Sequence, residues 1–191
     1  MRLYDPRLNK TLCIVELGNN EAFFSVTTCQ FSIRKSEGVY VIVGGARSLS
    51  YNPKSCDGGF LDVYKIEDSQ LHLVHRTEIE DVPMALSAFH GRLLVGIGKT
   101  LRIYDMGKKK LLRKCEYKLF PRNIISLHVQ GHRIFVGDMT ESFLLAVYNP
   151  FENRIDVVAD DTYPRWVVCS EQLDYDTIAG LKKKNLIQIF S

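Results

Sequence analysis

The sequence predicts an all-β protein built from a repeated unit, and three observations support that prediction. Two short motifs recur along the chain with a spacing of about 40 residues or slightly more. The intervals between them hold short runs in which apolar and polar residues alternate as in β-strands. No helical period of about 10 to 15 residues separates these runs, which argues against a parallel sheet. Four short strands in each repeat are typical of the blades of a WD40-like β-propeller.

The first motif is an apolar residue followed by an aromatic one. It begins the chain as RLYD and returns almost unchanged 100 residues later as RIYD. The steps between successive aromatic residues are 60, 40, 44 and 42 residues. The five copies are Leu3-Tyr4, Val63-Tyr64, Ile103-Tyr104, Val147-Tyr148 and Ile189-Phe190.

The second motif is a run of three mostly apolar residues that ends in glycine. Its four glycines are Gly44, Gly96, Gly137 and Gly180, which are separated by 52, 41 and 43 residues. A further strand-like run precedes each of these motifs, and another follows most copies of the first motif. Each repeat therefore holds four strands, which we designate A to D from the inside of the propeller outward.

These strands divide the chain into three full blades and two partial blades, one at each end. We expect the end of one blade at 1–17, full blades at 22–77, 83–117 and 122–159, and the start of another blade at 165–191. The total of 2 + 12 + 3 = 17 strands fits no closed ring of four blades. The sequence therefore predicts about four blades that form a segment of one larger propeller, with open ends that other blades or partners cover.

The clearest hairpin of the chain lies between Gly98 and Glu116. Strand-like alternation from Leu101 is interrupted by Gly107 and three lysines, and it resumes at Leu111. The preceding sequence GIGKT invites comparison with a phosphate-binding loop. That loop requires a glycine where Leu93 stands and a helix where a strand follows, so a turn between strands is the better interpretation.

One interval between the motifs is longer than the others and predicts a contact loop. Gly44 and Tyr64 are 20 residues apart, whereas the corresponding distances are 8, 11 and 10 residues in the later repeats. An insertion of about ten residues, from Arg47 to Gly58, therefore separates strands B and C of the first full blade. Its turn-rich sequence predicts a surface loop, with Arg47, Tyr51 and Lys54 as candidate partner contacts.

A second candidate contact patch follows the last full blade. Tryptophan, tyrosine and arginine are the residues that most often dominate protein interfaces. The patch consists of Asp160, Asp161, Tyr163, Arg165 and Trp166. The alternative is a turn between blades, with Pro164 at the start of strand A.

The charged residues point to no catalytic, cofactor or metal site. The 25 basic and 22 acidic residues give a net charge of +3, too small to indicate nucleic acid or membrane binding. The five histidines lack the spacing of a metal site, and the Asp160-Asp161 pair has no nucleophile nearby. The lysines at 108–110 fit either a solvated turn or a nuclear-localisation or RNA-contacting patch, and both interpretations stay open.

The cysteines and the N-terminal residues indicate an intracellular protein. The five cysteines are odd in number, widely spaced and mostly within apolar runs, so we expect reduced, buried side chains. The N-terminal stretch lacks the apolar segment of a signal peptide. No run of about 18 apolar residues is present to span a membrane.

Several longer runs carry a family resemblance. The chain contains VGIGKTLRIYDMGKKKLLRKCE, ADDTYPRWV and the pattern VGD-x-x-x-S at Val136 to Ser142. It resembles the family of large β-propeller subunits found in splicing factor 3b, in cullin ubiquitin ligases as the damaged-DNA-binding adaptor, and in the cleavage and polyadenylation specificity factor. The runs KKKLLRKCE and DDTYPRW are most similar to the splicing branch of that family.

The resemblance implies a part of the last of three propellers, in a non-catalytic scaffold without a cofactor. It implies a nuclear protein of the splicing factor 3b complex in the U2 small nuclear ribonucleoprotein, bound to a HEAT-repeat subunit and to small subunits. Adaptors of a cullin ligase or of the cleavage and polyadenylation machinery are alternatives, and an enzyme with a site at the central channel is a third hypothesis. Direct RNA contact stays open.

The chain departs from the family pattern after Gly180. The family usually has an acidic, glycine-containing turn there, whereas this chain has Leu181 followed by lysines at 182–184. The sequence therefore predicts a reversed charge at that turn and, with it, a changed partner contact.

Overall fold

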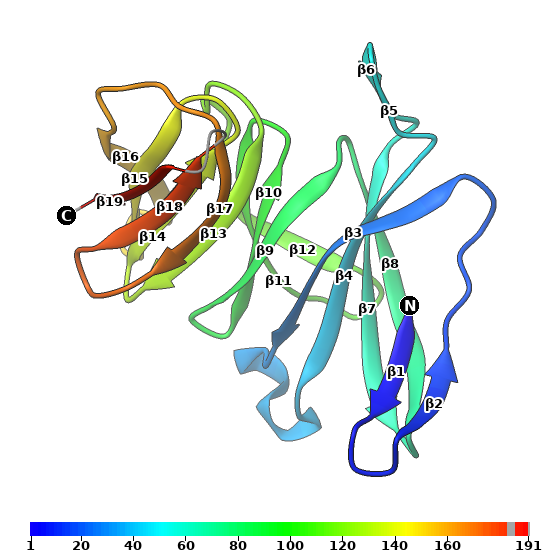
Figure 1. Ribbon diagram of the computed structural model, residues 1–191. Coiled ribbons are helices and arrows are strands. Elements are labelled where there is room, and N and C mark those ends of the chain that lie inside the picture. The colour runs from blue at the N-terminus through cyan, green and yellow to red at the C-terminus, as the bar shows by residue number, and fades with distance from the viewer. Residues whose placement is uncertain (183–185, 191) are drawn as a thin grey trace.

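The computed structural model describes residues 1–182 and 186–190, and within these ranges it describes every side chain except those of residues 35, 36, 182 and 186–190. The described chain is almost entirely β-strand, as predicted (Figure 1). The expected basic turn at 182–184 lies for the most part outside the described residues. No helix in the described ranges is long and apolar enough to cross a membrane.

Three four-stranded antiparallel sheets form the middle of the molecule, each with its strands side by side in sequence order apart from one inserted hairpin. The first contains β3 (Glu21–Cys29), β4 (Tyr40–Arg47), β7 (Gly59–Glu67) and β8 (Gln70–Ile79). The second contains β9 (Pro83–Phe89), β10 (Arg92–Ile97), β11 (Thr100–Met106) and β12 (Leu111–Tyr117). The third contains β13 (Ile124–Gln130), β14 (Arg133–Asp138), β15 (Ser142–Asn149) and β16 (Arg154–Asp160).

Smaller sheets lie at the two ends of the described chain. The N-terminal one pairs β1 (Arg2–Asp5) with β2 (Lys10–Ile14). The C-terminal one contains β17 (Val167–Gln172), β18 (Ile178–Lys182) and β19 (Leu186–Phe190). The inner strands β3, β9 and β13 neighbour one another, so the sheets follow each other like the blades of a partial propeller (Figure 1). The predicted fold class is confirmed.

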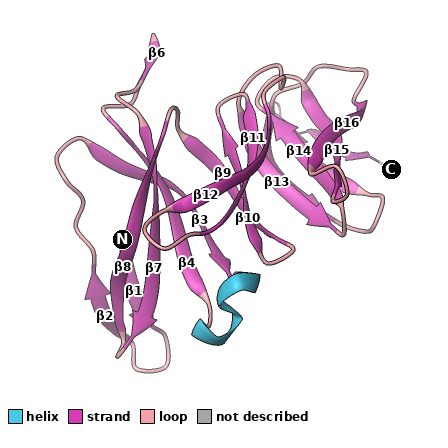
Figure 2. Cartoon of the chain, turned by 180° about the vertical axis from the view of Figure 1, so that it is seen from behind, coloured by secondary structure: helices cyan, strands magenta, loops and turns pink. Residues whose placement is uncertain are grey.

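Two short elements interrupt this pattern. A 3-10 helix, η1 (Ser32–Glu37), connects β3 to β4 and packs at the end opposite the inserted hairpin (Figure 2). The hairpin of β5 (Ser50–Tyr51) and β6 (Lys54–Ser55) projects from the connection between β4 and β7 (Figure 2). The predicted insertion between strands B and C is therefore a small hairpin of its own.

The first sequence motif marks the place where strand pairing is irregular. The register shifts between Leu3 and Tyr4, between Val63 and Tyr64, and between Ile103 and Tyr104. In each case the outer strand contributes one extra residue, which is a β-bulge. Bulges increase the twist of a strand, so these three outer strands bend around their blades. In the β15–β16 pair the bulge lies before the motif, between Leu145 and Ala146.

A neighbouring sheet approaches closely at two glycines of the second motif, Gly44 and Gly96, whereas the close neighbours of Gly137 are Ser126 and Phe143 of its own sheet. A Cβ atom on Gly44 would lie 2.7 Å from Pro83 of the next sheet, and one on Gly96 would lie 2.5 Å from Ile124 of the sheet after that. Only glycine leaves room for the adjacent inner strand at these positions. The glycine spacing in the sequence therefore reports the spacing of the blades.

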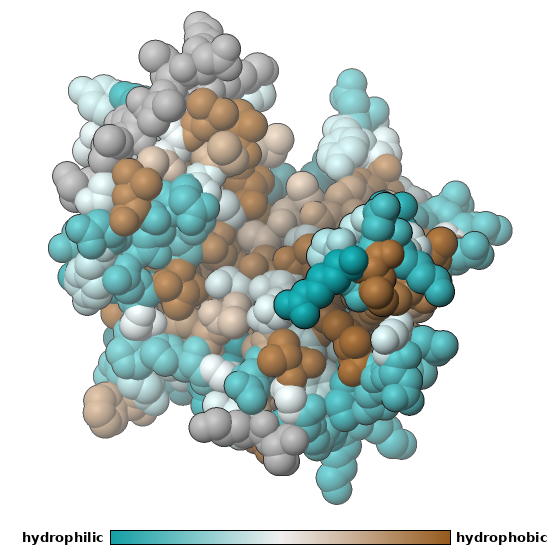
Figure 3. Space-filling model, turned by 60° about the horizontal axis from the view of Figure 1, so that its bottom comes forward, coloured by the Kyte–Doolittle hydropathy of each residue, from teal (hydrophilic) through white to brown (hydrophobic). Residues whose placement is uncertain are grey.

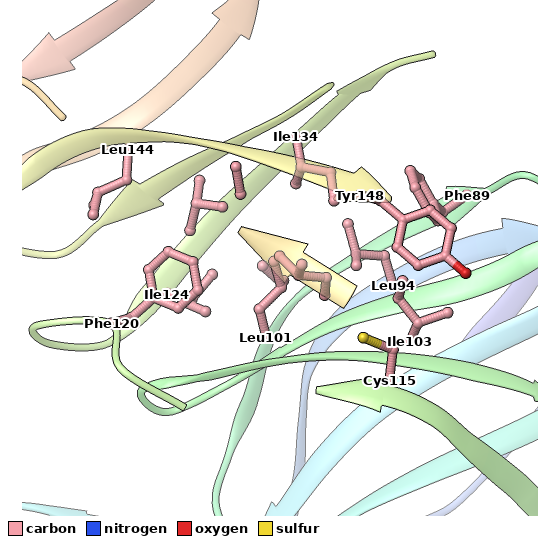
Figure 4. Packing of buried hydrophobic residues seen from close by; sticks show 14 residues of the cluster. Phe89, Leu94, Leu101, Ile103, Cys115, Phe120, Ile124, Ile134, Leu144 and Tyr148 are labelled. Carbon is pink, nitrogen blue, oxygen red and sulfur yellow. The ribbon is translucent and has the colours of Figure 1, made fainter. Parts of the chain in front are cut away.

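Hydrophobic clusters lie between sheets rather than within one. The largest joins the β9–β12 sheet to the β13–β16 sheet and includes Phe89, Leu94, Leu101, Ile134 and Tyr148 (Figure 4). A second cluster joins the β3–β8 sheet to β9–β12 through Phe31, Ile42 and Leu93 among others. Other hydrophobic residues lie uncovered on the face turned forward in Figure 3. Among the exposed hydrophobic residues is Val26, which is 65% exposed.

The hairpin predicted between Gly98 and Glu116 is confirmed as β11 and β12, which pair from Leu101↔Tyr117 to Met106↔Leu111. Its lysines at 108–110 are exposed in the turn. The turn is held from two sides, because Arg34 of η1 donates a hydrogen bond to the Gly107 carbonyl at 3.4 Å and Leu111 N–H donates to Thr77 Oγ1 at 2.9 Å. The basic turn is thus a well-supported part of the frame.

The cysteines differ from the expectation of uniform burial. All five are free thiols, and Cys29 and Cys115 are buried as expected. Burial raises the pKa of the Cys29 thiol to about 12. Cys169 is exposed, because the register of β17 shifts between Val167 and Cys169 and turns the thiol outward.

Candidate interaction surface

The β5–β6 hairpin stands on a base fixed by backbone hydrogen bonds. Arg47 N–H donates to the Gly58 carbonyl at 3.0 Å, and Asp57 N–H donates to the Arg47 carbonyl at 3.0 Å. Ser48 N–H donates to the Asn20 carbonyl at 2.8 Å. The inserted residues therefore leave and re-enter the sheet at one defined point.

Arg47, the first predicted contact residue, is engaged within the protein. Its guanidinium donates to Glu21 at 3.0 Å and to both carboxylate oxygens of Glu78 at 2.7 and 2.9 Å. These charged hydrogen bonds raise the pKa of Arg47, and the bond from Arg47 lowers the pKa of the Glu78 carboxyl. A bidentate pair of this kind fixes an arginine in one orientation. Arg47 thus positions the base of the hairpin.

Lys54, the second predicted contact residue, connects the hairpin to two other sheets. Its Nζ lies 2.9 Å from Asp81 Oδ2, just before β9, and 3.1 Å from Asn123 Oδ1, just before β13. The hairpin therefore reaches from the β3–β8 sheet across the second sheet to the start of the third. Asp81 also accepts weakly from the Cys56 thiol at 3.7 Å, so two residues of the second arm of the insertion contact this carboxylate.

We call the contacts of Lys54 with Asp81 and Asn123 the Lys54 brace. A cavity of about 230 Å³ lies beneath this brace. Its hydrophobic lining comes from the insertion, from the starts of β9 and β13, and from the turn after β14. Leu49, Met84, Ile125 and Met139 provide most of that lining. Tyr51, the third predicted contact residue, also lines the cavity and is 70% exposed.

The second predicted patch lies in the connection from β16 to β17. Asp161 is used inside that connection, because it accepts from Ser142 Oγ at 2.6 Å and from Tyr163 N–H at 3.1 Å. Asp160 is exposed, and the Arg165 guanidinium lies 5.5 Å from the centre of the Tyr163 ring. Trp166 is half exposed beside them. The patch therefore presents aromatic rings on a turn that Asp161 shapes.

The two predicted patches lie on the same side of the sheets but at different ends of the molecule (Figure 1). Both belong to connections that enter or leave the same edge of the blades, the B-to-C and D-to-A turns. The structure brings the insertion together with Asp81 and Asn123, which the sequence reasoning missed. Both residues occupy D-to-A connections. In a propeller these connections lie at the same edge of the blades as the B-to-C connections, so the sequence could have predicted that both residues lie near the insertion.

The pattern VGD-x-x-x-S has a structural explanation at the same edge. Asp138 is fully buried and accepts the backbone N–H groups of Arg122 at 2.9 Å, Thr140 at 3.0 Å and Glu141 at 3.2 Å. Ser142 then donates to Asp161, as described above. The two side chains of this pattern therefore fix one B-to-C turn and the neighbouring D-to-A turn.

Groups with catalytic chemistry are sparse in the described part of the chain. No cluster of three or more histidine, cysteine, aspartate or glutamate side chains that could hold a metal ion occurs there. His128 Nε2 lies 2.8 Å from Ser170 Oγ, and the Ser170 hydroxyl donates to Ser126 Oγ at 2.8 Å. These three side chains form one hydrogen-bonded chain between β13 and β17.

Successive four-stranded antiparallel sheets with neighbouring inner strands define a partial β-propeller. Comparison with known proteins identifies one family. The profile of the CPSF A subunit region family matches residues 1–191. The chain belongs to this CPSF A subunit region family.

Individual relatives are similar to nearly the whole chain. Splicing factor 3B subunit 3 of Danio rerio is 46% identical over 185 residues, which are 96% of this chain and 15% of that protein. Pre-mRNA-splicing factor RSE1 of Mycosarcoma maydis is 48% identical over 185 residues, with the same coverage. Spliceosome-associated protein 130 A of Arabidopsis thaliana is 46% identical over 186 residues. The resemblance to the splicing factor 3b branch is confirmed, and the chain spans about 15% of the length of these curated relatives.

Proposed function

We propose that this chain is part of a non-catalytic scaffold for pre-mRNA splicing in the nucleus. The observation that supports the proposal is the identity of 46 to 48% over 96% of the chain with proteins named as splicing factors or as a spliceosome-associated protein. The braced turns at one edge of the sheets supply the kind of rigid surface on which such a scaffold holds other subunits.

The proposed assembly is the splicing factor 3b complex of the U2 small nuclear ribonucleoprotein. The partners are its HEAT-repeat subunit and its small subunits. Residues 1–191 form one segment of a single propeller in this proposal, and the N-terminal and C-terminal sheets belong to blades that further strands complete.

The proposed contacts divide into two kinds of residue. Tyr51 and Tyr163 are exposed aromatic side chains that can be buried by a partner, as anchors of an interface usually are. Asp160, Arg165 and Trp166 lie beside Tyr163 and complete its patch. Arg47, Lys54 and Asp161 hold their turns in place through the ion pairs and hydrogen bonds described above.

Affinity purification of the full protein from nuclear extract, followed by mass spectrometry, tests the assembly. We expect the subunits of splicing factor 3b in the purified complex. Their complete absence would overturn the proposal. Recovery of a cullin would instead favour the ubiquitin-ligase adaptor.

The contact residues are tested in the same purification with Tyr51→Ser and Tyr163→Ser. We expect reduced recovery of the partner subunits from each variant. Phe151→Ser is the matched control, because Phe151 is 98% exposed and lies in a C-to-D turn at the opposite edge of the sheets. Equal losses from all three variants would contradict the assignment of the contact edge.

The name of the family supports a second candidate, a subunit of the cleavage and polyadenylation machinery. Recovery of cleavage and polyadenylation subunits without splicing subunits would establish this candidate in place of the first.

A further inference from the structure

The cavity beneath the β5–β6 hairpin has the size and enclosure of a site for one side chain. Its volume is about 230 Å³, and its hydrophobic walls come from four separate segments of the chain. Met84 and Met139 are two of those walls, and methionine side chains adapt their shape to different apolar groups. One large aliphatic or aromatic side chain fits such a space, whereas a strand or a helix does not.

Polar groups ring the mouth of this cavity. Asn123 lines it directly, and its amide meets the ammonium group of Lys54 at 3.1 Å. The Tyr51 side chain stands open to solvent on the hairpin side. A hydrophobic pocket with a few polar groups at its rim matches the anatomy of an anchor site in a protein interface.

The charged residues near the mouth of the cavity indicate which kind of partner segment would carry the apolar side chain that fills it. Lys54 is neutralised by Asp81 at 2.9 Å. Lys99 follows the cavity residue Gly98, and Arg122 precedes the cavity residue Asn123. Both are exposed, and neither has an ion-pair partner among the described side chains, those of residues 1–34 and 37–181. Two uncompensated cations beside a hydrophobic pocket favour an anionic segment.

We propose that this cavity binds one large apolar side chain of an acidic peptide segment in a partner protein, with Lys99 and Arg122 facing carboxylates that flank the anchor. The inference deepens the proposed scaffold function, on which it rests, by naming the chemistry of the segment that docks. The basic turn at 108–110 is not part of this site, because it lies in the C-to-D turn at the other end of β11.

Fluorescence anisotropy with the full protein tests the site with four labelled probes. The first is a twelve-residue Gly-Ser peptide with one central leucine flanked by four glutamates. The second replaces the leucine by serine, the third replaces the glutamates by lysines, and the fourth is a twelve-nucleotide oligouridine. We expect the leucine-glutamate peptide to bind at least about tenfold more tightly than the serine peptide, since one buried leucine provides that difference.

Two variants locate the binding. Met139→Trp fills the cavity and should weaken binding of the leucine-glutamate peptide about tenfold, whereas Leu119→Trp, at a position 79% exposed in the connection from β12 to β13, should not. The double change Lys99→Glu with Arg122→Glu should weaken binding about five- to tenfold at low salt and less at high salt. The matched control is Lys108→Glu with Lys109→Glu, which should stay within about twofold of the native protein.

Each remaining outcome overturns the inference. Equal binding of the leucine and serine peptides would exclude the anchor pocket, and equal losses from the two double charge changes would show unspecific attraction. Stronger binding of oligouridine than of the acidic peptide would assign the rim to nucleic acid. Thermal melting of every variant checks folding. Because no splicing subunit is present in this assay, its failure leaves the purification test of the proposed function unaffected.

Discussion

The junction between the β9–β12 and β13–β16 sheets is hydrophobic, whereas the junction between β13–β16 and β17–β19 depends more on polar contacts. Fourteen buried residues form the cluster at the first junction (Figure 4). Within the described side chains, four buried residues form the cluster at the second: Phe135, Phe143, Val167 and Ile178. There the hydrogen bonds that join His128, Ser170 and Ser126 connect the inner strands, and Gln172 donates to Gln130.

The two junctions are stabilised by different interactions. Hydrophobic burial is non-directional and grows with area, so the first junction contributes more stability than the second. Hydrogen bonds contribute less net free energy but fix the relative position of two strands. We therefore expect the β17–β19 sheet to open locally before the middle of the chain unfolds.

The largest effect on the free energy of unfolding is expected from an isoleucine-to-alanine substitution, which can be made at both junctions. Ile134 and Ile178 are both fully buried, the first in the hydrophobic junction and the second in the polar one. We expect Ile134→Ala to lower the free energy of unfolding by about 3 to 4 kcal/mol and Ile178→Ala by about 2 kcal/mol. Urea denaturation measures both values, and a larger loss from Ile178→Ala would contradict the comparison.

A second change tests the close packing of the hydrophobic junction. Gly96→Ala places a methyl group 2.5 Å from Ile124 Cγ2, so the neighbouring sheet must shift. We expect destabilisation of about 2 kcal/mol. Gly18→Ala is the control, because its nearest neighbour is the flexible Glu21 side chain at 3.4 Å and its effect should stay within about 0.5 kcal/mol. Similar melting temperatures for the two variants would show that the sheets do not approach as closely as described.

A third change tests the polar junction. Ser170→Ala removes the hydroxyl between His128 and Ser126, and we expect a loss of about 1 kcal/mol in stability. Amide hydrogen exchange should accelerate in β17 and stay unchanged in β9 and β10. Uniform acceleration across all sheets would mean that the two junctions unfold together.

A fourth prediction concerns pH. Burial lowers the pKa of His128 below its ordinary value of 6.5, and burial together with the nearby Arg34 lowers that of His75. The unfolded chain therefore binds a proton at each of these histidines more tightly than the folded chain does. Protonation lowers the free energy of unfolding, and this loss begins as the pH falls below 6.5 and continues down to the lowered pKa of the folded state. Glu21 and Glu78 have lowered pKa values and stay ionised over this range, so they add no slope. We expect His128→Gln to reduce the loss of stability between about pH 7.5 and pH 5.5, measured by denaturation at each pH. An unchanged slope would contradict this role of His128.

The smallest expected effect lies away from both junctions. Replacing the three lysines at 108–110 by serine should change the free energy of unfolding by less than about 0.5 kcal/mol, because their side chains are exposed. A loss above 1 kcal/mol would show that these lysines support the turn, which would place them with the frame and not with the surface.

Much of the frame was predictable because its causes are local. Three copies of the apolar and aromatic motif coincide with β-bulges, and Gly44 and Gly96 coincide with close approaches between sheets. These features recur from one sheet to the next, so their period is visible in the sequence. The hairpin from Gly98 to Glu116 was predictable for the same reason, since its alternation and its turn need only neighbouring residues.

The candidate surface was predictable only in part. The insertion from Arg47 to Gly58 was visible as an excess of residues over the period. Its internal pairing as β5–β6, and the use of Arg47 by Glu21 and Glu78, were not visible because the partners lie far away in the sequence. The exposed Cys169 was missed for a similar reason, since a register shift in β17 turned it outward.

The sequence by itself determined the repeat, the order of the strands and the place of the insertion, because hydrophobic alternation and turn residues act over short distances. Only the tertiary structure decided that Lys54 reaches Asp81 and Asn123, and that a cavity lined by Lys54 and Asn123 lies beneath these contacts. These residues meet because connections from three sheets share one edge of the propeller. Such an encounter depends on how whole blades stack, and that stacking is decided by the hydrophobic junctions between them.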